Sequence, residues 1–537
     1  MIRLTELSLP IDHSSADLRH AIVRRLNIVD EALIDYTVFK RSYDARKKNS
    51  EILFVYIVDV TVADEGALLR HFSNDNNVRP APDTRYKPVA VAPAGLSERP
   101  VIVGFGPCGL FAALTLAQMG FKPLVLERGR EVRQRTKDTW GLWRKKILTP
   151  ESNVQFGEGG AGLFSDGKLY SQIKDPKFYG RKVMEEFVRA GAPEEILYVS
   201  KPHIGTFRLT GVVSAMREEI KRLGGEVRFE SKAENFIIRD GRVGGVVLQN
   251  GEEIFTRYVV LALGHSSRDT FRRLYELGVH VEAKPFAIGF RIEHPQSLID
   301  NARLGKYAGH PELGAADYKL VYHARNGRAV YSFCMCPGGT VVAATSEPNK
   351  VVTNGMSQYS RNERNANAGI VVGINPDQDF PGGPLAGIAL QEQLEAQAFV
   401  LGGGDYCAPA QLVGDFLKGQ PSQALGEVIP SYKPGVLPGD LHPSLPAYAI
   451  EAIREALPQF GKQIRGFDRA DAVLTGVETR TSSPVRITRD ATSMQSLNTR
   501  GLFPAGEGAG YAGGILSAGV DGIKVAEAVA LAMLADR

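Results

Sequence analysis

The chain has 537 residues, which at about 150 residues per domain predicts three to four domains. Hydrophobic residues make up 43% and charged residues 23%, ordinary values for a globular protein that exclude wholesale disorder. The 64 basic side chains exceed the 60 acidic ones by only 4, too small an excess to indicate nucleic-acid binding by itself. We therefore expect no nucleic-acid partner.

Cysteine content and hydropathy predict a cytoplasmic location. Four cysteines in so long a chain do not make a disulfide framework, so a reducing compartment is the simpler expectation. The first residues lack the basic region and apolar core of a signal peptide. No run of about 18 apolar residues predicts a transmembrane helix, so we expect no membrane contact.

Residues 1–90 predict a small N-terminal α/β domain. A strand (IRLTELSLP), a helix (SSADLRHAIVRRLNI), two strands around a polar turn at 45–50 and a second helix (ADEGALLRHFS) give the order β-α-β-β-α. The Pro-rich, polar stretch that follows includes the linker that we place at residues 91–97.

The remaining chain predicts a discontinuous α/β domain with a second domain inserted into it. Residues 98–268 alternate strands and helices, and residues 269–489 have a mixed pattern, with helices near 390–401 and 446–457. Residues 490–537 return to a strand and a long apolar helix. We expect the first and last of these segments to form one domain.

The segment PVIVGFGPCGLFAALTLAQMGFKPLVLERG carries a dinucleotide-binding motif. An apolar strand runs into Gly104, Gly106 and Gly109, which open an apolar helix, and a second strand ends at Glu127. The first glycine permits the tight turn, the second lets the backbone approach a pyrophosphate, and the third lets the helix pack on the sheet. Glu127 lies about 20 positions further on, where an acid hydrogen-bonds ribose hydroxyls and would repel a 2′-phosphate.

Two later segments, YVVLALGHSSRDTF and GLFPAGEGAGYAGGILSAGVDGIKVAEAVA, complete a resemblance to the glutathione-reductase-like FAD superfamily. In that superfamily the late strand ends in a Gly–acid pair, here Gly506 and Glu507, that reaches the ribityl or pyrophosphate part of FAD. The resemblance also places the start of the final helix, at Gly513, Gly514 and Ile515, beside the N1–C2 edge of the flavin.

Further segments narrow the resemblance to one bacterial family. GEGGAGLFSDGKL, KPHIGT, KPFAIGFRIEHP, FCMCPGGTVVAATSE and NGMS are similar to segments of the uncharacterised FAD-dependent dehydrogenases, which carry an extra N-terminal α/β domain. The resemblance implies FAD as cofactor, and the α/β fold class. It implies a three-layer, Rossmann-like FAD-binding domain that is interrupted by an α+β substrate domain and preceded by the N-terminal domain.

The resemblance also assigns cofactor contacts. It places Glu127 and Arg128 at the adenosine ribose, Ala233 at the adenine, and the glycine-rich loop over the cofactor. The expected cofactor-binding residues are Gly104, Gly106, Gly109, Glu127, Arg128, Gly159, Gly160, Asp166, Ala233, Gly264, Gly506, Glu507, Gly513, Gly514 and Ile515.

The expected function is an FAD-dependent oxidoreductase, a dehydrogenase or reductase that transfers hydride between the flavin and a small organic substrate. A second strand–glycine–helix–acid unit is missing, so NAD(P)H or another donor or acceptor would reach the flavin transiently. One alternative is a flavoprotein that acts on or docks to a macromolecule such as tRNA through residues 1–90. Another is a non-catalytic flavin-binding sensor.

The sequence does not assign a catalytic residue. Strand alternation puts Arg291 and Glu293 on one face and His294 on the other, so the first two either hold a carboxylated substrate or form a structural ion pair. His203 and His265 are either proton donors or hydrogen-bonded core histidines.

Cys334 and Cys336 share one face of a predicted strand, with Cα atoms about 6.6 Å apart, at the outer edge of disulfide reach. They are either plain thiols or a redox pair, and no metal site is expected because no other Cys/His cluster completes one. The polar stretch 354–369 is either an exposed loop or a lid.

Overall fold

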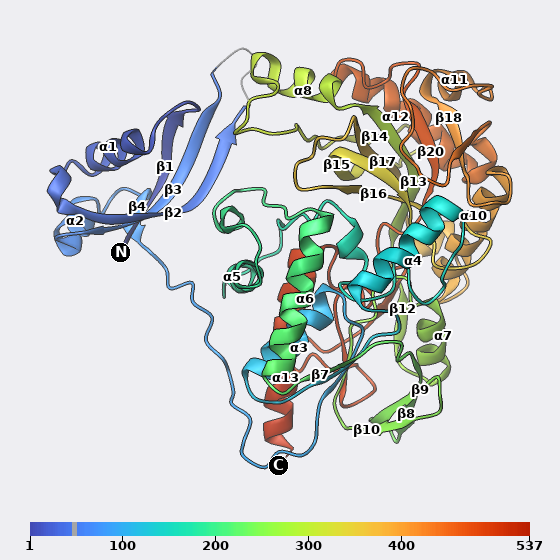
Figure 1. Cartoon of the computed structure of the whole chain (residues 1–537), viewed down its shortest axis with the longest axis horizontal. Helices are drawn as coiled ribbons and strands as arrows, with labels where there is room; N and C mark the ends of the chain where they lie inside the picture. The colour runs from blue at the N-terminus through green and yellow to red at the C-terminus, as the bar shows by residue number, and fades with distance from the viewer. Residues whose placement is uncertain (46–50, 537) are drawn as a thin grey trace.

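The computed structural model describes residues 1–45 and 51–536, so most of the predicted turn at 45–50 lies outside the described residues. A small N-terminal α/β unit stands beside a larger body (Figure 1). Its antiparallel sheet has the order β2-β3-β1-β4. The predicted β-α-β-β-α order is confirmed, whereas β4 was not predicted because three residues carry too little pattern. The elements are β1 (Ile2–Pro10), α1 (Ser15–Leu26), β2 (Leu33–Asp44), β3 (Leu53–Val62), α2 (Glu65–His71) and β4 (Val78–Pro80).

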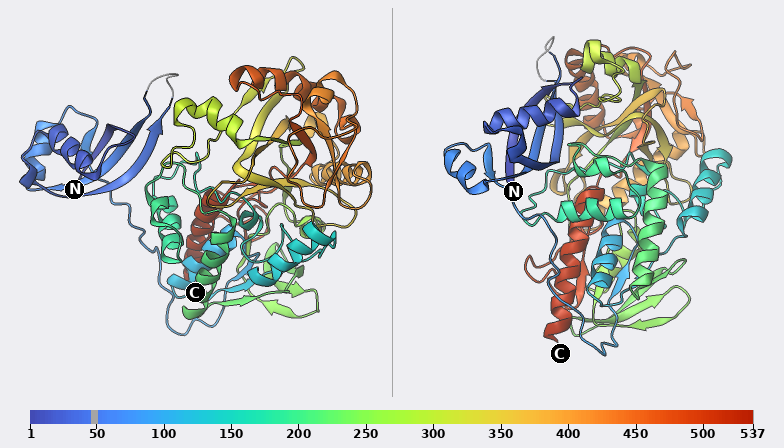
Figure 2. Two further views of the ribbon diagram at one scale, coloured as in Figure 1. Left: turned by 45° about the horizontal axis from the view of Figure 1, so that its top comes forward. Right: turned by 60° about the vertical axis from the view of Figure 1, so that its left-hand side comes forward.

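The exposed edge of β2 meets the larger body at Arg41. The Arg41 N–H donates to the Tyr198 carbonyl oxygen at 2.6 Å, and the Ser200 N–H donates to the Arg41 carbonyl oxygen at 2.9 Å. The Arg41 guanidinium also forms an ion pair with Glu312 at 3.0 Å. Figure 2 (left) shows the N-terminal unit extending from the side of the larger body. Part of an otherwise unpaired strand edge is therefore covered.

The centre of the larger body is a five-stranded parallel sheet with the order β22-β11-β5-β6-β7. β22 comes from the end of the chain and pairs with β11, so segments far apart in sequence complete one sheet. Successive residues of these strands point to opposite faces and join two different hydrophobic clusters. The strands are β5 (Val101–Val103), β6 (Leu124–Leu126), β7 (Glu226–Arg228), β11 (Val259–Leu261) and β22 (Leu502–Pro504).

Helices cover one face of the parallel sheet, and a small antiparallel sheet together with one further helix covers the other. α3 and α13 pack closely: a Cβ at Gly522 of α13 would lie 2.3 Å from the Cys108 carbonyl oxygen of α3. The helices on or near the sheet are α3 (Pro107–Gln118), α4 (Val132–Lys145), α5 (Tyr179–Arg189), α6 (Thr206–Arg222), α7 (Arg268–Glu276) and α13 (Ile515–Ala535). The small sheet is β8 (Ala233–Arg239), β9 (Arg242–Leu248) and β10 (Glu253–Phe255).

Between β11 and β22 the chain builds an eight-stranded, mostly antiparallel sheet with the order β14-β15-β17-β13-β20-β18-β19, where β16 pairs with β15. Its strands are β13 (Phe286–Pro295), β14 (Val321–His323), β15 (Ala329–Ala343), β16 (Thr353–Ser357), β17 (Asn365–Ile374), β18 (Ala408–Leu412), β19 (Val436–Pro438) and β20 (Val473–Glu478). Its helices are α8 (Gln296–Leu304), α9 (Pro376–Asp379), α10 (Ala386–Leu401), α11 (Val413–Lys418) and α12 (Ala447–Gln463).

The chain passes from the parallel sheet to the inserted sheet along β12 (Val281–Ala283) and returns along β21 (Val485–Ile487), and these two strands pair with each other. The stretch 354–369, expected as a loop or lid, is strand at both ends, where 354–357 pairs with β15 and 365–369 pairs with β13 and β15, and it is a turn at 358–364. Within the described ranges 1–45 and 51–536, no helix has both the length and the apolar character needed to cross a membrane.

A buried carboxylate connects the two sheets. Glu395 of α10 accepts hydrogen bonds from the Arg268 guanidinium, at 2.7 and 3.0 Å, and from the Arg480 guanidinium, at 2.8 and 2.9 Å. Arg268 begins α7 beside the parallel sheet, and Arg480 lies two residues after the end of β20 in the inserted sheet. All three side chains are buried, so removing the shared anion would leave two buried cations without their main counter-charge.

We expect Glu395→Gln to lower the free energy of unfolding by about 3–5 kcal/mol, the cost of breaking a buried ion pair. Chemical denaturation followed by tryptophan fluorescence measures this change. Glu392→Gln on the same helix is the matched control, because Glu392 is 24% exposed and pairs with Arg272 near the surface. The control should cost no more than about 1 kcal/mol. Equal effects of the two substitutions would contradict the role given to Glu395.

Candidate cofactor-binding site

A cavity of about 370 Å³ lies at the carboxyl ends of β5 and β6, where the glycine turn, the start of α13 and residues of the inserted sheet meet. This volume lies within the range of about 300–1,000 Å³ that is typical of ligand pockets. The predicted residues that line it are Gly104, Gly106, Glu127, Arg128, Gly160, Asp166, Ala233, Gly264, Gly506, Glu507, Gly513, Gly514 and Ile515. Gly109 and Gly159 are not among the lining residues and pack behind it.

The glycine turn after β5 shows which glycines the protein itself requires. Gly104 has φ +102°, and a Cβ there would lie 2.3 Å from the Ala262 carbonyl oxygen. A Cβ at Gly109 would lie 2.0 Å from the Gly104 carbonyl oxygen, so this glycine lets the helix pack on the turn. At Gly106 the nearest protein atom would be 3.5 Å away, an ordinary contact. Packing of the protein therefore does not require a glycine at position 106, and the missing side chain leaves its backbone open to the cavity.

The glycine-rich loop 157–162 lies directly against this turn. The Gly159 N–H donates to the Phe105 carbonyl oxygen at 2.9 Å. A Cβ at Gly160 would lie 2.8 Å from Gly106 Cα. The two loops thus approach backbone to backbone and enclose one wall of the cavity.

Glu127 holds both loops in place through its carboxylate. Oε2 accepts a hydrogen bond from the Phe105 N–H at 2.8 Å. Oε1 accepts from the Gly129 N–H at 2.8 Å and from the Gly157 N–H at 2.9 Å. A carboxylate offers about four acceptor positions, so these bonds leave capacity for a further donor from the cavity. The sequence predicted a ribose contact for Glu127 but not this structural role, which needs the positions of Phe105 and Gly157 in space.

Arg128 is strongly engaged by protein carboxylates. Its guanidinium donates to both carboxylate oxygens of Glu151, at 2.6 and 2.9 Å, and to both of Asp269, at 2.9 Å. Its charge also lies 4.1 Å above the centre of the Phe156 ring. These partners fix Arg128 at the edge of the cavity where Ala233 also lies.

The start of α13 and the Gly506–Glu507 pair form the opposite wall. The Gly506 N–H donates to the carboxylate of Asp521 in α13 at 2.8 Å. The Arg489 guanidinium donates two hydrogen bonds to the same carboxylate, at 2.6 and 3.0 Å. A Cβ at Gly506 would lie 2.8 Å from Cys108 Cβ, so a side chain is excluded there. The N-terminus of α13 faces the cavity through Gly514 and Ile515.

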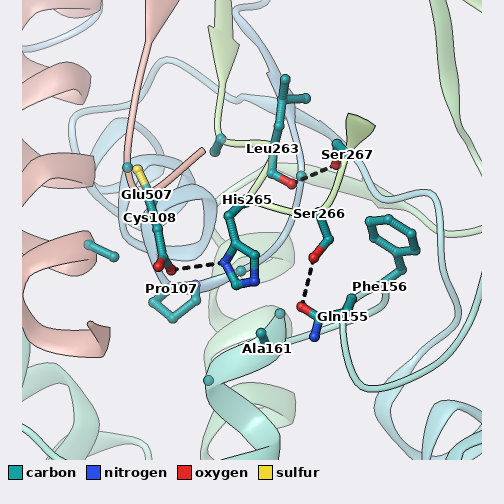
Figure 3. Close-up of a pocket in the computed structure, with 18 of the residues that line it drawn as sticks. Pro107, Cys108, Gln155, Phe156, Ala161, Leu263, His265, Ser266, Ser267 and Glu507 are labelled. Carbon is teal, nitrogen blue, oxygen red and sulfur yellow. Dashed lines mark hydrogen bonds and ion pairs between the residues drawn. The ribbon is translucent and has the colours of Figure 1, made fainter. Parts of the chain in front are cut away.

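His265 is the histidine that reaches the cavity (Figure 3). Its Nδ1 lies 3.5 Å from Glu507 Oε2. Its Nε2 is buried and has no hydrogen-bond partner among the described residues. A buried ring nitrogen without a partner costs free energy unless a ligand or water completes it, so this atom is a polar group available to the cavity.

His203 and His294 form their contacts outside the cavity. His203 stacks on Tyr359, with its Nε2 2.9 Å from the carbonyl oxygen of that residue. Burial, and then the charge of Arg361, lower the pKa of His203. His294 lies 2.6 Å from the Phe467 carbonyl oxygen, and burial lowers its pKa to about 4. Neither histidine lines the cavity.

The predicted pairing of Arg291 with Glu293 is wrong. Arg291 pairs instead with Glu478 of β20, with one hydrogen bond of 2.9 Å and a second, shorter one. Glu293 accepts hydrogen bonds from Ser431 and Asn365. The sequence could not indicate Glu478, because only the pairing of β13 with β20 brings it beside Arg291.

Asp166 lies in the loop over the cavity and is clasped by Arg361, which extends from the turn between β16 and β17. Burial would raise the pKa of the Asp166 carboxyl, but the charge and hydrogen bonds of Arg361, with the nearby charge of Lys168, together lower that pKa. Lys168 follows in the same loop, 3.8 Å from Asp166, and donates to the Met335 carbonyl oxygen. Cys334 lines the cavity from β15, with Cys336 beside it.

Two family models match parts of this chain, and one relative matches almost all of it. Residues 285–481 match the family described as "FAD-dependent protein, C-terminal domain-like", and residues 1–61 match a domain of unknown function. An uncharacterised protein of Clostridium beijerinckii is 50% identical over 528 residues, which cover 98% of each chain.

Solved structures give weaker likenesses. L-proline dehydrogenase from P. horikoshii is 14% identical, with 80% of this chain and 92% of that chain covered at a TM-score of 0.33. Glycine oxidase from Geobacillus kaustophilus is 11% identical, with 81% and 95% covered at a TM-score of 0.35. Scores this low support no conclusion about this chain.

We expect Glu127→Ala to weaken FAD binding by more than tenfold. The substitution removes the charged acceptor of a ribose hydroxyl, an interaction worth about 1.5–3 kcal/mol, where 1.4 kcal/mol is a factor of ten. It also leaves three backbone N–H groups around the cavity without their acceptor. Fluorescence titration of the apoprotein with FAD measures the affinity. Glu131→Ala is the control, because that side chain is 46% exposed and lies 3.5 Å from its partner Arg217. Unchanged affinity for Glu127→Ala would show that the carboxylate is dispensable.

Proposed function

This chain belongs to the bacterial family of FAD-dependent proteins that its Clostridium relative represents, and we propose that it is an oxidoreductase, a dehydrogenase or reductase. It would transfer hydride between the flavin and a small organic substrate. The observation that carries the proposal is one cavity in which the dinucleotide glycine turn and the N-terminus of α13 face the same space.

The residues present fit FAD. The cavity exposes the bare backbone of Gly106, and a Cβ at Gly513 or Gly514 would meet nothing within 4 Å. The starts of α3 and α13 add partial positive charge, which suits the pyrophosphate at one and an electron-rich ring edge at the other. Glu127 keeps acceptor capacity for a ribose hydroxyl. The ADP half would therefore lie along the β5–β6 side, and the flavin ring near α13.

FAD supplies the hydride chemistry when bound, and the chain's own residues supply electrostatics and a proton. The N-terminus of α13 would favour negative charge on a flavin held there by about 1 kcal/mol, which corresponds to roughly 20 mV in a two-electron potential. His265 would hold or move a proton at Nε2, and Glu507 lies 3.5 Å from Nδ1 of the same ring. Substrate would enter between this wall and the inserted sheet, where Lys168 and Tyr170 also line the cavity.

The protein should purify yellow with FAD and not FMN, because Glu127 and the glycine turn are placed to bind an adenosine diphosphate. Chromatography of the heat-released cofactor tests this expectation. Anaerobic mixing with a panel of small hydride donors and acceptors, followed at the visible flavin band, then tests the oxidoreductase activity. Recovery of FMN alone, or of only a nicotinamide nucleotide, would contradict the proposal, as would a flavin that no donor in the panel reduces.

NADH and NADPH should reduce the flavin slowly and without tight saturation. Among the residues that the structure describes, the Gly402–Gly404 segment, another glycine cluster, forms a turn after α10 and does not open a nucleotide-binding helix. Stopped-flow measurement of flavin bleaching against NAD(P)H concentration provides the rates. Saturation at micromolar NAD(P)H would show a dedicated nicotinamide site and overturn this expectation.

A further inference from the structure

Two cysteines lie together where β15 departs from regular strand geometry. The pairing register of β15 with β17 shifts between Phe333 and Cys336 and again between Cys336 and Gly339. Cys334 adopts φ +42°, which is unusual for a residue with a side chain. The Cys336 Sγ lies 3.3 Å from the Cys334 carbonyl oxygen, so its side chain folds back toward residue 334. The expectation of two thiols on a regular strand face is therefore corrected.

Positive charge surrounds this pair. The Arg291 guanidinium of β13 donates to the Cys334 carbonyl oxygen at 2.8 Å, and Lys168 donates to the carbonyl oxygen of Met335, between the two cysteines. A hydrogen bond from Cys336, with the charges of Arg291 and Lys168, lowers the pKa of the Cys334 thiol against the effect of burial. Because thiolates are the reactive form in thiol–disulfide chemistry, this environment favours reaction at Cys334.

Acidic groups pair with both cations. Glu478 binds Nε and Nη2 of Arg291, which leaves Nη1 for the Cys334 carbonyl oxygen. Asp166, which also pairs with Arg361, lies 3.8 Å from Lys168. The pKa of the Cys334 thiol is lowered with these acids in place. Cys334 lines the same cavity as the N-terminus of α13, whereas Cys336 lies behind it with no exposed surface. The pair thus combines one thiol that reaches the cavity with one that is shielded from it.

We propose that Cys334 and Cys336 form a dithiol–disulfide pair that exchanges two electrons with FAD in the cavity. Formation of the S–S bond breaks two S–H bonds and releases two protons and two electrons, which convert FAD to its two-electron-reduced form. The reverse reaction breaks the S–S bond and returns both thiols. The inference rests on the proposed function, because the pair needs FAD beside it, and it makes a thiol or disulfide compound a candidate class of substrate.

Thiol counting on the wild-type protein tests the pair without any substitution. The FAD-loaded protein is oxidised in air or reduced anaerobically, then denatured and alkylated, and the alkylated cysteines are counted by mass spectrometry. The chain has four cysteines, all with free thiols in the structure. We expect about two alkylated cysteines in the oxidised protein, with Cys334 and Cys336 protected, and all four in the reduced protein.

Anaerobic dithionite titration then counts electrons. The oxidised wild type should take up about four electrons per FAD, two for the flavin and two for the disulfide, whereas Cys336→Ser should take up about two. Cys407→Ser is the matched control, because Cys407 contacts Lys146 and Pro434 and does not line the cavity. It should match the wild type.

The outcomes separate the two proposals. A protein with FAD that takes up two electrons and shows four alkylated cysteines in its oxidised form overturns the redox pair and leaves the proposed function standing. A protein that purifies without FAD and does not bind it overturns both. Should Cys336→Ser fail to fold, the thiol count on the wild type still decides.

Discussion

The cavity depends on one carboxylate, that of Glu127. Three backbone N–H groups, from Phe105, Gly129 and Gly157, donate to it. These residues belong to the turn after β5, the chain leaving β6, and the glycine-rich loop. Without this acceptor three buried backbone donors, one from each loop, would be left unpaired. An acid at this position therefore shapes the site before any ribose reaches it.

A second constraint fixes the inserted sheet over that site. Glu395 accepts hydrogen bonds from Arg268 and Arg480, and the paired strands β12 and β21 carry the chain across in both directions. Arg268 is the first residue of α7, and Arg480 lies just after β20. The ion pairs with Glu395 therefore fix the start of α7 and the end of β20 relative to each other. Cys334 reaches the cavity because of this docking, since β15 belongs wholly to the inserted sheet.

Features formed by residues that are close in sequence could be predicted, whereas contacts between distant segments could not. The turn at Gly104, the helix after it and Glu127 follow one another in sequence, so spacing alone indicated them. The ion pair of Arg291 with Glu478 could not be predicted from sequence spacing, because it depends on the register of β13 with β20. The same holds for the bulge at Cys334, which strand alternation cannot reveal. Gly109 and Gly159, which were predicted as cofactor contacts, are not among the residues that line the cavity.

The position of β22 in the parallel sheet has a consequence for how the protein is made. During synthesis the ribosome completes β5, β6, β7 and β11 long before β22 and α13 emerge. Until then one edge of the sheet is open and the apolar face of α3 lacks its helix partner. The nascent chain therefore has half of a nucleotide site while the inserted sheet is being translated. FAD that binds only the completed cavity would be captured late, and it would then add to the stability of the folded chain by mass action.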